Sequence, residues 1–143
     1  MADGSGMEAL ARLLSEERLL VELLVFKLVE LQQLLLAGET RFLSWGSHEV
    51  ERATTSVREV ELERAILVSS LGTFRGLDEP SLSDLVADAP EPWRSQLEAS
   101  HRGLRSAAAE VADLSAALEV ADLSAALGAA GRARLPSLAD FLT

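Results

Sequence analysis

The sequence predicts an all-α protein: an antiparallel hairpin of two long helices, a third long helix packed along it, a short connector helix and a flexible C-terminal tail. A leucine-rich stretch without Gly or Pro spans residues 7–36, and Ala, Leu, Glu and Arg dominate the composition. No alternating strand pattern is present. The chain of 143 residues suits one domain, which we place at residues 1–127, with residues 128–143 as the tail.

The first predicted helix, residues 7–36, carries the apolar face that the other helices cover. Its leucines recur at the spacing of one helix face. They are Leu10, Leu13, Leu20, Leu24, Leu28, Leu31 and Leu35. Such a helix is roughly 45 Å long, so it cannot bury this face against itself. Leu19, Phe26 and Val29 lie among polar residues, where they are either covered by another element or exposed.

A second helix is predicted over residues 41–71. Gly38 suits the C-terminal cap of the first helix and Thr40 the N-cap of the second, and so short a connection indicates an antiparallel hairpin. The predicted inward residues are Phe42, Val50, Ala53, Val57, Val60, Leu67 and Leu71. Arg64 falls on this face with Glu49 at its edge. Either both neutralise charges across the hairpin, or the arginine stem extends to solvent.

The third helix is predicted over residues 92–118, after an irregular region rich in Gly and Pro. Within that region, EPSLSDLVADA predicts a short helix with Pro80 in its first turn, and Gly72 ends the second helix. The inward residues of the third helix are Trp93, Leu97, Leu104, Ala108, Val111, Leu114 and Leu118.

The C-terminal part contains an internal repeat, VADLSAAL at 111–118 and again at 120–127. A shift of nine residues turns a helical pattern by roughly 180°, so either the helix ends near Glu119 or the second copy faces outward. We predict a partner-binding surface from the repeat and the tail, with the alternative that the tail folds back onto Phe26 and Leu19. The predicted surface comprises Leu118, Val120, Leu123, Leu127, Leu135, Leu138, Phe141 and Leu142.

Charge and composition exclude several function classes. The net charge is −10 and no basic stripe is present, which argues against nucleic acid and anionic membranes as partners. The chain has no Cys, which excludes disulfides and thiol chemistry. The N-terminus does not read as a signal peptide, and Glu22, Lys27 and Glu30 interrupt the one candidate for a membrane span, so we expect no membrane insertion and a cytoplasmic location.

No catalytic or metal-binding pattern emerges. His48 and His101 each lack a second His at helical ligand spacing, and neither a phosphate-binding Gly-rich loop nor a nucleophile motif is present. We therefore expect no enzyme activity, no metal and no cofactor. Trp45 and Gly46 invite comparison with small secreted helical hairpins that carry a Trp-x-Gly turn. Here no residue separates the two, and they fall inside the second predicted helix.

The order of features resembles the FlgN family of flagellar export chaperones in its actinobacterial form. The resemblance covers roughly residues 8–118 and rests on the joint order of the leucine-rich first helix, AGETRFL, LER, the acidic connector ending in APEPW, and LEASHRGLRSAAAEV. The repeat and the LPSLADFLT tail depart from the family pattern.

This resemblance implies a cytoplasmic chaperone for flagellar type III export. Such a protein binds the C-terminal helices of the hook–filament junction proteins, FlgK and FlgL, through its C-terminal part, and delivers them to the export gate. Two alternatives remain open. One is a coiled-coil adaptor or scaffold without an export role, and the other is a secreted hairpin of the Trp-x-Gly type.

Overall fold

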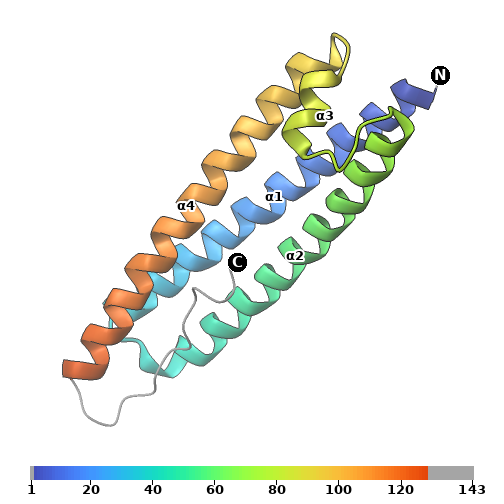
Figure 1. Ribbon diagram of the computed structural model, residues 1–143. Coiled ribbons are helices and arrows are strands. Elements are labelled where there is room, and N and C mark those ends of the chain that lie inside the picture. Colours follow the sequence, from blue (N-terminus) through green and yellow to red (C-terminus); the bar gives the residue numbers. More distant parts are fainter. Residues whose placement is uncertain (1, 129–143) are drawn as a thin grey trace. The chain divides into compact units, whose positions relative to one another are not determined.

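The computed structural model of the chain describes the backbone of residues 2–128 and the side chains of residues 6–121 (Figure 1). It confirms the all-α prediction, since the described residues form helices and no strand. The elements are α1 (Ala2–Leu36), the 3₁₀ turn η1 (Thr40–Phe42), α2 (Leu43–Phe74), the short α3 (Leu82–Asp88) and α4 (Trp93–Gly128). The predicted hairpin, third long helix and connector helix are therefore all present.

The described residues pack as two compact units, and each of the three long helices contributes to both. Unit 1 comprises the part of α1 up to Leu19 together with Arg58–Ser106. Unit 2 comprises Leu20–Val57 and the part of α4 from Ala107 onward.

The core of unit 1 is closed by α3. Leu82, Leu85 and Val86 are buried on this short helix. Its start is fixed by a capping box, in which the Ser81 hydroxyl accepts from the Asp84 amide and the Asp84 carboxylate accepts from the Ser81 amide. Pro80 therefore precedes the N-cap, and its predicted place in the first turn is wrong. The other buried apolar residues of unit 1 are Met7, Leu10, Ala11, Leu14, Val60, Val68, Ala89, Leu97 and Leu104.

The predicted end of α2 at Gly72 is also wrong. Gly72 is helical, and its missing side chain lets Pro80 pack directly against it, where a β-carbon would overlap the ring. The cap lies at Gly76, with φ of 78°: its amide donates to Thr73 O at 3.1 Å, and the Leu77 amide donates to Gly72 O at 2.8 Å. These two bonds are those of a Schellman cap. Gly72 thus serves close packing, and Gly76 ends the helix.

In unit 2 the hairpin connection follows the prediction at Gly38. Gly38 has φ of 71°, its amide donates to Leu35 O at 3.1 Å, and the Glu39 amide donates to Leu34 O at 3.0 Å. Thr40 is not an N-cap, because it lies within η1. The buried apolar residues of unit 2 are Val21, Leu24, Leu28, Leu31, Leu43, Val50, Ala53, Val57, Ala107, Val111 and Leu118.

Most predicted inward positions are confirmed. Ala108 is exposed, and a further set is only partly buried: Leu13, Leu20, Leu35, Phe42, Leu67, Leu71, Trp93 and Leu114. Leu24 and Leu28, at 2% and 1% exposure, are central to the core as predicted. The long helices extend further than expected: α1 begins at Ala2 rather than at residue 7, and α4 passes residue 118. Met7, the predicted first residue of this helix, is 1% exposed and belongs to the core of unit 1.

Candidate partner-binding surfaces and charged sites

The predicted surface at the repeat lies on a continuous helix. Because α4 runs through Glu119 to Gly128, the alternative of a helix end near Glu119 is wrong. Leu118 is 1% exposed and belongs to the core of unit 2, whereas Val120 is 66% exposed. Val111, nine residues before Val120, is 4% exposed, so the two valines lie on opposite sides of α4, as the nine-residue shift predicts.

The structure describes only part of this predicted surface. Leu123 and Leu127 belong to α4, but their side chains lie outside the described residues. The tail positions Leu135, Leu138, Phe141 and Leu142 also lie outside the described residues. Val120 is thus the one exposed, described apolar residue of the predicted surface, and the grouping of the eight residues stays a prediction.

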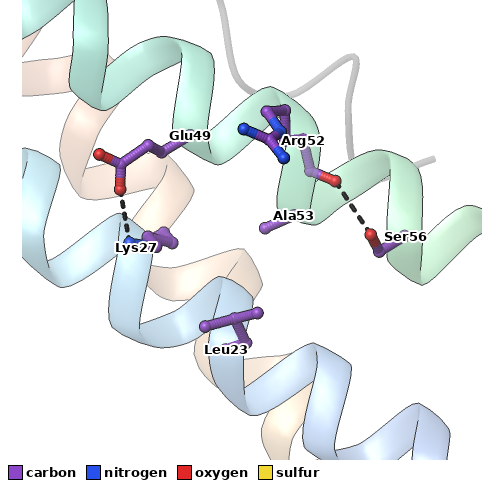
Figure 2. A pocket seen from close by; sticks show the side chains of 6 residues that line it. All are labelled: Leu23, Lys27, Glu49, Arg52, Ala53 and Ser56. Carbon is purple, nitrogen blue, oxygen red and sulfur yellow. Dashed lines mark hydrogen bonds and ion pairs between the residues drawn. The ribbon is translucent and has the colours of Figure 1, made fainter.

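A groove of about 430 Å³ separates α1 and α2 within unit 2 (Figure 2). Leu23 and Ala53 form its apolar part, and Lys27, Glu49, Arg52 and Ser56 complete the lining. Leu23 is 44% exposed, so an apolar side chain from outside can contact it. The Ser56 hydroxyl donates to the Arg52 carbonyl at 3.2 Å, which satisfies its donor within α2.

One wall of this groove is an ion pair that links the two helices. Lys27 Nζ donates to Glu49 Oε2 at 2.5 Å and lies 3.7 Å from Glu30 Oε1. The hydrogen bond to Glu49 raises the pKa of Lys27, and the same bond lowers the pKa of Glu49. Both groups are therefore held in their charged forms. The groove is suited to a side chain or a helix edge, and it brings together no acid–base pair aimed at a common substrate position.

Unit 1 contains a buried carboxylate that the sequence analysis missed. The side chain of Glu17 is 3% exposed, and both its oxygens accept from Arg64, at 2.6 Å from Nε and 3.1 Å from Nη2. Together with the Lys27–Glu49 pair, this confirms that Arg64 and Glu49 neutralise charges across the hairpin. The available signal was the position of Glu17, which follows Leu10 and Leu14 on the leucine face.

Two other titratable groups lie close to this pair. Burial raises the pKa of Glu61, with a further contribution from the charge of Glu17. Burial lowers the pKa of His101, and the positive charges of Arg105 and Arg64 lower it further. The negative charge of Glu17 acts in the opposite direction and raises it. The lowered pKa favours the neutral form of His101 beside the buried pair.

Several large apolar side chains are exposed outside these sites. Leu19, Phe26 and Val29 on α1, at 68%, 57% and 38% exposure, are exposed rather than covered by another described element. Trp45 lies beside the hairpin connection, with its ring centroid 5.8 Å from that of Phe42, and is 70% exposed. The remaining ones are Leu36, Leu62, Ile66 and Phe74.

Within the part of the chain that the structure describes, no group of three His, Cys, Asp or Glu side chains is placed to hold a metal ion. Among the helices described, none has a stretch long and apolar enough to cross a membrane.

Over the described residues, the fold and these surfaces define a helical protein with exposed apolar side chains and shallow grooves. Comparison with protein-family descriptions, with characterised proteins and with solved structures found no match to this chain.

Proposed function

We propose that the protein is a cytoplasmic flagellar export chaperone of the FlgN type. It binds the C-terminal helices of hook–filament junction proteins similar to FlgK and FlgL and delivers them to the type III export gate. The sequence resemblance suggests this role. The helix order supports it, because the leucine-rich α1, the hairpin, the connector and α4 occur in the order on which the resemblance rests.

The observation that carries the proposal is the change of face on α4. Leu118 is buried in the core of unit 2, whereas Val120, the first residue of the second repeat copy, is exposed. A segment that forms part of a helical assembly exposes an apolar face before it assembles, and the apolar face of another helix can cover it. Covering Val120 would contribute about 1–2 kcal/mol, and neighbouring apolar residues add to this.

Binding to the C-terminal segment of a hook–filament junction protein tests the proposal. The full chain is co-expressed with that segment, and the complex is recovered by affinity purification and titrated. We expect Val120→Asp to weaken the complex at least about tenfold, because it places a charge within the contact.

Leu36→Asp is the matched control, since Leu36 is 67% exposed and also lies in unit 2. It should leave the affinity unchanged. A wild-type chain that does not bind the segment, or equal losses in both variants, contradicts the proposal.

A further inference from the structure

The outer side of α2 in unit 1 exposes a surface without charge. From Ala65 to Phe74 the sequence contains no charged residue, although most of this stretch is exposed. Leu62 and Ile66 are 62% and 63% exposed. We name this the Ile66 surface; it comprises Leu62, Ala65, Ile66, Ser69, Ser70 and Thr73. Exposed charge-free helical faces with large apolar residues are typical of interaction sites.

The shape of the Ile66 surface suits another helix. Ala65, Ile66, Ser69, Ser70 and Thr73 line a shallow hollow of about 520 Å³, in which the small side chains allow a close approach. Residues 62, 66, 69 and 73 are separated by four, three and four positions, which is the spacing of a coiled-coil seam. A partner helix can therefore lie along α2 with its own apolar residues set against this row.

Thr73 can be covered by a partner at little cost. The Thr73 hydroxyl donates to the Ser69 carbonyl at 3.0 Å, so its donor is already satisfied within α2. Burying a hydroxyl is unfavourable mainly when it loses hydrogen bonds to water without replacement. Thr73 therefore contributes a methyl group to a contact without leaving an unpaired donor.

The charge beside the Ile66 surface selects the partner. Glu59, Glu61 and Glu63 lie at its N-terminal end with Arg58, while Arg64 is engaged by the buried Glu17. This leaves an excess of negative charge at that end. The whole chain carries −10, so a second copy would be repelled, whereas a cationic segment would be attracted.

We propose that the Ile66 surface docks an amphipathic helix of another protein, with an apolar seam and with Lys or Arg residues placed opposite Glu59 and Glu63. This surface belongs to unit 1 and is separate from the end of α4, so the inference does not rest on the proposed function. The partner helix packs along α2, and the ion pairs with Glu59 and Glu63 at one end fix its position along this helix.

Fluorescence anisotropy with synthetic helical probes tests this inference on the full chain. One probe has a Leu and Ile seam with Lys beside it at one end, and the matched probe has Glu in place of Lys. We expect the Lys probe to bind and the Glu probe to bind at least about tenfold more weakly at low salt. The double variant Glu59→Lys with Glu63→Lys should reverse this preference.

Variants of the apolar row supply the second part of the test. Ile66→Asp and Leu62→Asp change exposed side chains, so circular dichroism should show an unchanged fold, and each should weaken binding of the Lys probe at least about tenfold. Leu36→Asp, in unit 2, should leave binding of the Lys probe unchanged. Equal binding of both probes, or retained binding in Ile66→Asp and Leu62→Asp, overturns the inference. A dimer of the wild-type chain in sedimentation equilibrium that Ile66→Asp abolishes also overturns it, because the occupant is then a second copy.

Discussion

The buried Glu17–Arg64 pair predicts an unequal response to removal of its two members. The side chain of Glu17 is 3% exposed and that of Arg64 is 26% exposed. Arg64→Leu leaves a buried carboxylate without its cation, which costs about 3–5 kcal/mol of unfolding free energy. Glu17→Leu leaves a guanidinium that can extend toward water on its stem, and the cost is smaller, about 1–2 kcal/mol.

Urea unfolding at neutral pH measures these differences, and the double variant completes the cycle. When both residues are Leu, no charge remains buried, and we expect a stability within about 1 kcal/mol of wild type. If the two single losses are small and equal, and add up in the double variant, then Glu17 is hydrated in solution and the pair is not buried.

Three further predictions concern packing and pH. Leu28 is 1% exposed and Leu36, on the same helix, is 67% exposed. Leu28→Ala should therefore cost about 2–5 kcal/mol of unfolding free energy, and Leu36→Ala under about 0.5 kcal/mol. Equal losses in denaturant unfolding would contradict this. Gly72→Ala should cost about 1–3 kcal/mol, because its β-carbon overlaps the ring of Pro80, and an unchanged melting temperature would contradict that close packing. Burial and two neighbouring arginines lower the pKa of His101 in the folded state, so the unfolded chain binds the proton more tightly and stability should fall as pH decreases through the unfolded value of about 6.5. In unfolding titrations across this range, His101→Gln should lose less stability than wild type, and parallel profiles would contradict the reasoning.

The helices were predictable where the pattern of burial is periodic. Leu24, Leu28 and Leu31 recur at helical spacing, and each is buried as that spacing requires. Gly38 was predictable as a cap because it directly follows a long apolar run and only Gly adopts positive φ without cost. The buried leucine face and the Gly38 cap each depend on residues that are close in the sequence, so both can be predicted from the sequence.

The errors occurred where a residue acts through a distant part of the chain. Gly72 was interpreted as a helix end because its packing partner, Pro80, follows an intervening turn. Glu17 was not identified as buried because charged residues are rarely placed in a core, and only its contact with Arg64 makes this position favourable.

The candidate surfaces were less predictable than the helices. Exposure of Val120 follows from the nine-residue repeat. The Ile66 surface was missed, because exposed Leu62 and Ile66 differ from core residues only in the direction they face in the folded chain. Which apolar residues remain uncovered depends on how the other helices pack, and the periodicity of one helix does not contain that information.

Truncation after Leu118, the last buried residue described on α4, tests whether the partner binds to the residues beyond it. Binding of the C-terminal helical segment of a hook–filament junction protein and thermal unfolding are measured on the truncated and the full chain. We expect the affinity of the truncated chain to fall at least about tenfold while its melting temperature barely changes. If the truncated chain binds the segment with unchanged affinity and melts early, then the removed residues support the fold, and the partner surface lies on the hairpin of α1 and α2.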